Sequence, residues 1–319
     1  MGRYGLVSDD LERLHAYTNE NGRVVLSSGV EMPMAVYRGQ SEDFLQCLPT
    51  LARMAHIEDQ LLALCRNTAF EDAISDHPYV RYCEQTNFMG LPLNTDRQGL
   101  AQHYGLSTDL LDLTSNFDVA TFFATCRWNA DSRSYRPVKF ATGPGVLYRL
   151  RPFLFVGMDQ TAELHWVGWQ PLHRPEQQRA CAIRLEKGLD LSRLTGVEKV
   201  LFRHSARTAS RIWKSFDEGR ALFPADAAAE LAEQAGRLMS FTRDQIDRSW
   251  SKLDDWNVAE TTMPDRQRVE GNVDLSVTDE SVLSWDGLDV LRDETVMCDQ
   301  LRETLNRVRV RMTADHCVS

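Results

Sequence analysis

The sequence predicts an α+β fold in which helices flank a mixed β-sheet. Short stretches rich in apolar residues at 32–37, 145–150 and 197–202 are typical of strands. Apolar residues recur at helical spacing over residues 57–70 and again over 119–126. Because segments of both kinds occur along the chain, we expect a sheet core with helices packed against it.

The chain has 319 residues, of which 43% are hydrophobic and 26% charged, so it can bury a sizeable core. Charged residues become denser and glycine scarcer beyond about residue 240. We therefore expect a main domain over residues 1–240 and a C-terminal, mostly helical accessory region over residues 241–319. Within that region, residues 294–312 have the pattern of an amphipathic helix.

The charge and the cysteines exclude several classes of protein. Lys and Arg number 36 and Asp and Glu 46, which gives a net charge of −10. Nucleic-acid backbone and anionic membranes attract a positive surface, so neither is expected as a partner, although one or two arginines suffice for a small anion. No apolar run approaches the roughly 18 residues of a membrane span, and no signal peptide is recognisable. The seven cysteines lack CxxC or zinc spacing, which predicts reduced thiols and a cytoplasmic location.

The remaining elements follow from short local patterns. Ser115 and Asp118 fit a capping box that begins a helix, and Gly105 ends the helical turn before it. Four further segments complete the prediction: a short helix over residues 11–17, a loop over 129–144, a strand over 153–156 and a helix after Leu222-Phe223-Pro224.

The first candidate site residue is Arg38, which follows a strand-like run in Tyr37-Arg38-Gly39-Gln40. A guanidinium group offers a planar fork of donors to phosphate or carboxylate, and the adjacent glycine lets a ligand approach the backbone. On spacing alone, an ordinary salt bridge at a strand end is the more frequent explanation.

A second candidate cluster is Gln102-His103-Tyr104-Gly105-Leu106-Ser107-Thr108. Histidine can transfer protons near neutral pH, and amide and hydroxyl groups can orient a ligand. A hydrogen-bonded framework histidine is the alternative. We interpret Asp112 as a buried orienting carboxylate.

A third candidate pair, Glu176 and Gln178, lies in the polar stretch 173–179, for which a loop entering a strand is the simpler explanation. P-loop, dinucleotide-fingerprint, Gly-x-Ser-x-Gly and His-Glu-x-x-His patterns are absent from the sequence, and no metal site is expected.

Taken in order, these stretches resemble the FRG domain family. The Tyr37-Arg38-Gly39-Gln40 stretch resembles the Phe-Arg-Gly motif that names the family, and residues 48–53 resemble its Leu-x-Pro-Ser-Leu-x-Arg segment. The block AQHYGLSTDLLDLTSNFDVATFFA, residues 101–124, is similar to the family's longest motif. Arg174 and Gln178, and Leu222-Phe223-Pro224, resemble later family segments, so the likeness spans residues 30–235.

The motif order is also similar to that of the ADP-ribosyltransferase superfamily, which implies its fold and NAD as the substrate. The resemblance implies that Arg38 grips the diphosphate and that His103 or Tyr104 holds the nicotinamide side. It further implies that Glu176 or Gln178 completes the site. Gln178 stands where a catalytic glutamate is usual, and Glu176 is expected on the same strand face as its substitute.

Two functions of different classes follow from the resemblance. The first is an NAD-using ADP-ribosyltransferase or NAD glycohydrolase that acts as a bacterial toxin or phage-defence effector. The second is a non-catalytic nucleotide- or protein-binding module with the same pocket, for which the C-terminal region is the expected partner surface. A protein acceptor or partner is expected to bind through the C-terminal region. The expected catalytic residues are His103, Glu176 and Gln178, and the expected ligand-binding residues are Arg38, Gln102, Tyr104, Ser107, Thr108 and Thr114.

Overall fold

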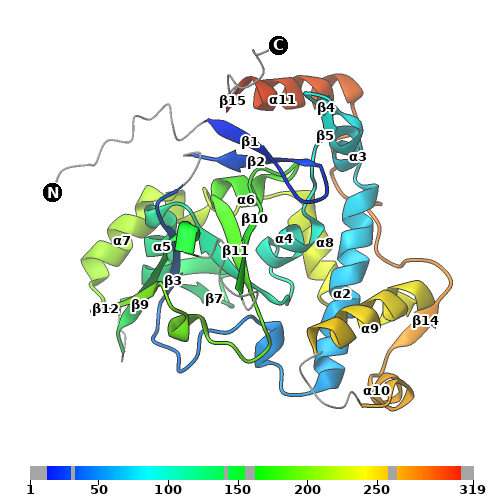
Figure 1. Cartoon of the computed structure of the whole chain (residues 1–319), viewed down its shortest axis with the longest axis horizontal. Coiled ribbons are helices and arrows are strands. Elements are labelled where there is room, and N and C mark those ends of the chain that lie inside the picture. Colours follow the sequence, from blue (N-terminus) through cyan, green and yellow to red (C-terminus); the bar gives the residue numbers. More distant parts are fainter. Residues whose placement is uncertain (1–12, 30–32, 140–142, 155–161, 258–263, 310–319) are drawn as a thin grey trace, which may run out of the picture.

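A six-stranded β-sheet forms the centre of the computed structural model, which describes residues 13–29, 33–139, 143–154, 162–257 and 264–309 (Figure 1). The strand order is β10-β11-β6-β3-β9-β12. These strands are β3 (Val36–Gln40), β6 (Leu110–Thr114), β9 (Gly145–Leu150), β10 (Ala162–Trp166), β11 (Ala180–Leu185) and β12 (Val197–Phe202).

The fold combines helices and a sheet as predicted, but the prediction of a mixed sheet is wrong for these six strands. Every neighbouring pair in the sheet is antiparallel. Apolar runs identify the segments that become strands, whereas strand direction depends on the connections between them, which the runs do not encode. The bounds of β9 and β12 agree with the predicted runs.

Helices cover the sheet and continue beyond it (Figure 1). The helix α5 (Phe117–Thr125) packs against β3 and contributes buried Val119 and Phe122 to the core. The other helices in the first part of the chain are α2 (Ile57–Asp76), α3 (Pro78–Gln85), α4 (Arg97–His103), α6 (His173–Gln177), α7 (Ala206–Ser215) and α8 (Ala227–Ala235). Short 3₁₀ turns are η1 (Leu51–Arg53), η2 (Pro152–Leu154), η3 (Leu191–Arg193) and η4 (Asp217–Gly219).

The start of α5 differs from the predicted capping box. Asn116, not Ser115, is the N-cap residue, and its side-chain oxygen accepts from the backbone N–H groups of Asp118 and Val119. Asparagine is among the best N-cap residues because its short side chain reaches these unpaired donors. The helix therefore begins one residue later than the capping box predicted.

Two predicted elements have the wrong type because pairing partners distant in the chain override a short local pattern. Leu14–Thr18, predicted as part of a helix, is strand β1, which pairs with β2 (Val24–Ser28) and with β15 (Val308–Arg309). The predicted loop over 129–144 contains β8 (Ser134–Pro137), which pairs with β7 (Cys126–Asn129).

Two predicted segments extend beyond the described residues. Phe153 and Leu154, expected in a strand, belong to η2, and residues 155–156 lie outside the described ranges. The predicted helix over 294–312 corresponds to α11 (Glu294–Asn306), which is followed by β15, and residues 310–312 are not described.

The C-terminal third of the chain packs on the rest through α9 (Arg243–Trp256), which lies against α2. Apolar side chains of both helices share one core cluster with Phe241 and Val269. The remaining elements are the paired strands β13 (Ser240–Thr242) and β14 (Ser276–Thr278), the helix α10 (Arg266–Asn272), and the small hairpin β4 (Asn87–Phe88) with β5 (Leu91–Pro92). The domain boundary at residue 240 stays a prediction.

The described cysteines are all free thiols, five of them buried, in agreement with the sequence. Burial raises the pKa of Cys65 and of Cys126 to about 11, which keeps both protonated and unreactive at neutral pH. In the described ranges, no helix combines the length and the apolar character that crossing a membrane requires.

Candidate functional site

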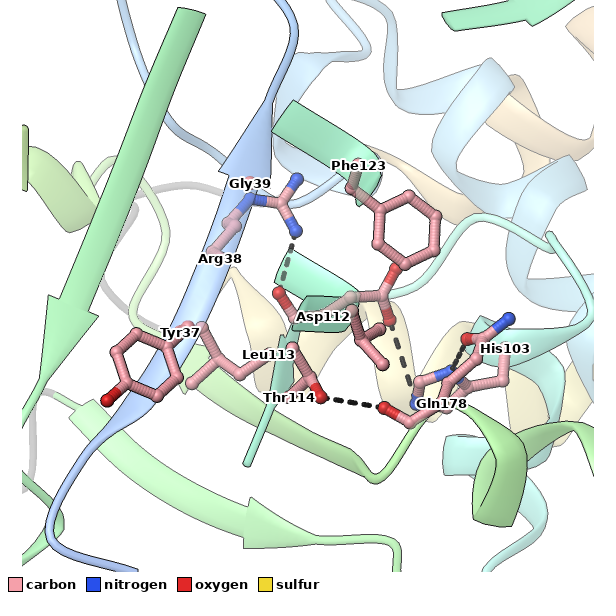
Figure 2. Close-up of a pocket in the computed structure, with 10 residues that line it drawn as sticks. Tyr37, Arg38, Gly39, His103, Asp112, Leu113, Thr114, Phe123 and Gln178 are labelled. Carbon is pink, nitrogen blue, oxygen red and sulfur yellow. Dashed lines mark hydrogen bonds and ion pairs between the residues drawn. The ribbon is translucent and has the colours of Figure 1, made fainter. Parts of the chain in front are cut away.

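A polar pocket opens beside the central strands β3 and β6 (Figure 2). Its cavity volume is about 70 Å³, below the roughly 300–1,000 Å³ typical of small-molecule sites, so only part of a larger ligand fits inside it. Four of the predicted site residues line it, namely Arg38, His103, Thr114 and Gln178. The remaining walls are Tyr37, Gly39, Asp112, Leu113, Val119 and Phe123.

Arg38 lies where β3 and β6 separate. The two strands pair only at Tyr37 and Thr114, and beyond that point the Arg38 Nη1 donates to the backbone oxygen of Asp112 at 2.8 Å. The Arg38 Nε is buried and has no partner. The predicted alternative of a strand-end salt bridge is wrong, because among the described residues no carboxylate pairs with Arg38. Its guanidinium charge is therefore available to a ligand.

Gly39 permits the close approach of β3 to α5 that shapes this wall. A Cβ atom at position 39 would lie 1.9 Å from the Ala120 carbonyl oxygen and 2.6 Å from the Ala124 nitrogen, both backbone atoms. No side chain fits there without moving the helix. The Arg-Gly dipeptide thus combines a ligand-facing cation with a strand–helix contact.

His103, the last residue of α4, is held by Gln178. Its Nδ1 lies 2.9 Å from Gln178 Oε1, and Gln178 Nε2 donates to the Leu222 backbone oxygen at 3.0 Å. Because Gln178 Oε1 can only accept, Nδ1 is the donor and carries a proton. The amide of Gln178 thereby orients the buried imidazole ring and turns Nε2 toward the pocket.

Asp112 faces the free edge of this histidine. Its Oδ1 lies 3.9 Å from His103 Nε2, which is too far for a hydrogen bond, and both atoms are buried without a partner. The Asp112 side chain is 45% exposed, so the predicted burial holds for one oxygen and not for the whole carboxylate. A ligand hydroxyl between the two atoms can bond to both.

Thr114 has a structural part in this arrangement. Its hydroxyl donates to the Gln178 backbone oxygen at 2.7 Å and accepts from the Asn116 N–H at 3.0 Å. It therefore ties the end of β6 to the turn that carries Gln178. With both bonds made, the hydroxyl has little left to offer a ligand.

Glu176 does not reach the pocket. It lies on the helix α6 rather than on a strand, and its carboxylate accepts from Arg307 near the C-terminal end of the described chain. The prediction that Glu176 and Gln178 share a strand face is wrong, because the chain turns between them. Gln178, at the end of α6, alone points toward His103.

The other expected binding residues lie elsewhere. The Thr108 hydroxyl donates to the Gln102 side chain, and the Ser107 carbonyl accepts from Asn67 at 2.6 Å. These three residues hold the loop after α4 in place and do not line the pocket.

Tyr104 is also absent from the lining. Its hydroxyl donates to Asp226 at 2.5 Å, and burial followed by the charge of Asp226 raises its pKa. The Arg174 guanidinium lies 4.4 Å from the centre of the Tyr104 ring, so that ring face is covered.

Two residues near the pocket were not predicted as site residues. Burial, and then the charge of Arg38, lowers the pKa of Arg53, although Arg53 does not itself line the pocket. The segment 48–53, which contains Arg53, indicated a resemblance to the family but did not by itself mark Arg53 as a site residue. Burial and then the charge of Asp112 raise the pKa of Tyr135 to about 12, and no local pattern marked this residue.

The structure is an α+β domain with a pocket assembled from its most distinctive sequence segments. Residues 33–133 match the family model of the FRG domain, so the chain contains an FRG domain, and the predicted resemblance is confirmed. No curated protein and no solved structure matches the chain. Among the residues that the structure describes, no three His, Cys, Asp or Glu side chains gather as metal ligands.

Proposed function

We propose that the pocket binds NAD and that the FRG domain cleaves its nicotinamide–ribose bond, by ADP-ribosyl transfer or by hydrolysis. One observation supports this most directly. Arg38 Nε, His103 Nε2 and Asp112 Oδ1 are buried around one pocket, and none has a partner. Unpaired buried polar atoms are costly and rare in folded proteins, so a polar ligand that satisfies all three explains why they are retained.

Arg38, which lines the pocket, is the proposed diphosphate ligand, and Arg53 is a candidate second one. Neither guanidinium pairs with a carboxylate among the described residues, so the charge of each is available to an anion. A diphosphate supplies that anion and matches the planar donor fork of each arginine. This arrangement needs no positive surface elsewhere and is compatible with the net charge of −10.

Asp112 and His103 are the proposed ligands of the ribose next to nicotinamide. As the glycosidic bond breaks, nicotinamide leaves with the bonding electrons, and positive charge develops on the ribose. A carboxylate stabilises that cation better than an amide does. Because Glu176 is bound by Arg307, the carboxylate role implied by the resemblance passes in this proposal to Asp112.

A second candidate is a non-catalytic nucleotide-binding module. It is favoured by Gln178, whose amide is used at both ends for structural hydrogen bonds. In this alternative, Asp112 and His103 hold a ribose hydroxyl without chemistry. The C-terminal region is the proposed partner surface of this module.

Calorimetry with NAD and chromatographic detection of released nicotinamide, both on the full chain, separate these possibilities. We expect wild type to bind and cleave NAD, Arg38→Ala to lose binding, and Asp112→Asn to keep binding and lose cleavage. Arg220→Ala is the matched control, because this exposed arginine pairs with Asp217 away from the pocket. Binding without cleavage supports the module, and no binding of NAD overturns the proposal.

The biological role proposed with the enzyme is that of a bacterial toxin or phage-defence effector. Expression of wild type in a bacterial host is then expected to arrest growth and deplete NAD, whereas Asp112→Asn at equal expression does neither. Equal growth with both proteins contradicts this role without affecting the binding experiment.

A further inference from the structure

An open groove separate from the pocket lies between the β7–β8 hairpin and α7. Its cavity volume is about 710 Å³, in the upper part of the roughly 300–1,000 Å³ of typical small-molecule pockets. Six of the residues that line it carry the argument: the cations Arg127, Arg136, Lys139 and Lys214 and the aromatic residues Trp128 and Trp213.

Among the described residues, four cations and no carboxylate line the groove. Arg127 has an acidic partner in Glu42. Arg136 donates to Ser132 Oγ at 3.3 Å and lies 5.8 Å from the centre of the Trp213 ring, but it has no carboxylate partner among the described residues. Lys139 and Lys214 form no ion pair in the described ranges. Positive charge without acidic partners in a chain of net charge −10 indicates an anionic ligand.

The hairpin register adds to this indication. Arg127 and Arg136 are direct cross-strand partners, so their side chains project from the same face. Like charges directly opposite each other in a sheet are unfavourable. Glu42 pairs with Arg127 and balances part of this charge, so Arg136 is the member of the pair that has no carboxylate partner among the described residues.

The aromatic residues identify the kind of anion. The Trp128 side chain is half-exposed at 51%, although tryptophan is usually well buried. Trp213 lies on α7, and its indole N–H donates to the Tyr135 backbone oxygen, which fixes the ring between the hairpin and the helix. Aromatic rings beside cations in an open groove bind the bases and phosphates of single strands. An acidic peptide uses the cations but has no comparable need for the rings.

We infer that this groove binds single-stranded nucleic acid, with phosphates on Arg136, Lys139 and Lys214 and a base stacked on Trp128. This departs from the expectation drawn from net charge. At about 0.1 M salt, charges more than about 10 Å away are largely screened, so the local cations determine binding. The inference is independent of the proposed cleavage of NAD.

Fluorescence anisotropy with labelled oligo-uridine and oligo-thymidine of about 12 nucleotides, a length within single-strand site sizes, tests the inference on the full chain. We expect wild type to bind at about 50 mM salt and to weaken at about 200 mM, with log K falling by about 2 per decade of salt for three phosphate contacts. The double variant Lys139→Glu/Lys214→Glu is expected to bind at least about tenfold more weakly and with a shallower salt slope.

Two further variants make the test specific. Trp128→Ala is expected to weaken binding while leaving the salt slope unchanged, because no charge is removed. Arg268→Glu on α10 is the matched control for charge reversal and is expected to bind as wild type does, with circular dichroism confirming that each variant is folded. No binding of either oligonucleotide, or equal binding by the double variant, overturns the inference. Groove-dependent binding of polyglutamate but not of oligonucleotides assigns the groove to an acidic protein instead.

Discussion

Two aspartate–histidine pairs lie near opposite ends of α4, and they differ in every respect that bears on function. Asp96 precedes the helix, and its Oδ2 lies 2.6 Å from His165 Nε2. His103 ends the helix, and its Nε2 lies 3.9 Å from Asp112 Oδ1. The first pair is closed and hydrogen-bonded, whereas the second leaves both facing atoms unpaired. The difference separates a pair that holds the fold together from one arranged to receive a ligand.

In the closed pair, both carboxylate oxygens of Asp96 make hydrogen bonds. Oδ1 accepts from the Gly99 N–H as the N-cap of α4, and Oδ2 bonds His165. Burial tends to raise the pKa of Asp96, but the hydrogen bond and charge of His165 outweigh it and leave that pKa below its usual value. Burial likewise tends to lower the pKa of His165, and Asp96 raises it above 6.5.

The largest expected effect is that of Asp96→Ala. It removes the helix cap and the partner of His165, which together cost about 2–4 kcal/mol of unfolding free energy. Asp112→Ala is the counterpart in the open pair and is expected to cost less than about 1 kcal/mol, because the Asp112 side chain makes no hydrogen bond to the part of the chain that the structure describes. Urea denaturation of both variants measures the difference, and equal losses break the comparison.

Gln178→Glu is expected to have the next largest effect. A carboxylate cannot donate to the Leu222 carbonyl, and two facing acceptors cost about 1–3 kcal/mol of stability. Gln177 is exposed, so Gln177→Glu makes the same chemical change at the surface and serves as the control. This control is expected to change the stability very little. Thermal denaturation compares the two, and a neutral Gln178→Glu contradicts the positioning role given to this amide.

The closed pair also predicts a smaller, pH-dependent effect. His165 binds its proton more tightly in the folded state, so its contribution is present below pH 6.5 and is lost as pH rises through its raised pKa. The lowered pKa of Asp96 makes its contribution present above pH 3.8 and lost as pH falls through the folded value.

Unfolding free energies of wild type and His165→Gln, measured across this range, check the pH effect. The difference between them is expected to shrink as pH rises above 6.5. Burial lowers the pKa of His77 to about 4 in wild type and variant alike. Taking the difference between the two proteins therefore cancels the contribution of His77. The exposed His173→Gln is the control, and a difference that grows with pH is incompatible with the closed pair.

The smallest expected effect on stability belongs to Asp112→Asn. This change keeps the shape of the side chain and removes only its charge, so the unfolding free energy is expected to stay within about 0.5 kcal/mol of wild type. Added NAD is expected to raise the melting temperature of both proteins but not that of Arg38→Ala. If Asp112→Asn loses much stability in the absence of ligand, the Asp112–His103 pair stabilises the fold as the Asp96–His165 pair does. The proposed difference between the two pairs would then be wrong.

Much of the pocket could be predicted from the sequence because its parts lie in recognisable segments. Arg38, His103 and Gln178 come from three separate stretches, and each was singled out for donor or acceptor groups that the structure brings to one place. The strands β9 and β12 were predicted with the right bounds, because both are short stretches rich in apolar and β-branched residues. The functional groups of side chains and the pattern of apolar residues can both be recognised in a short stretch of sequence, and these predictions depended on them.

The misplaced residues depended on distant partners. Glu176 is held by Arg307, and Leu14 pairs with Val308, so no window around either residue contains the deciding contact. Gln102, Ser107 and Thr108 have suitable groups, but the turn after α4 directs them to one another and to Asn67. Ligand-binding chemistry identified side chains that could serve, while the path of the backbone decided which ones face the pocket.

The order of strands in the sheet bears on how the FRG domain can be inherited. The matched segment, residues 33–133, holds only β3 and β6 of the six strands. Their other neighbours in the sheet, β9 and β11, come later in the chain, as does Gln178. A recombination event that moved the matched segment alone into another gene would deliver two strands with exposed edges and an incomplete pocket. The heritable module must therefore be longer than the segment that makes it recognisable.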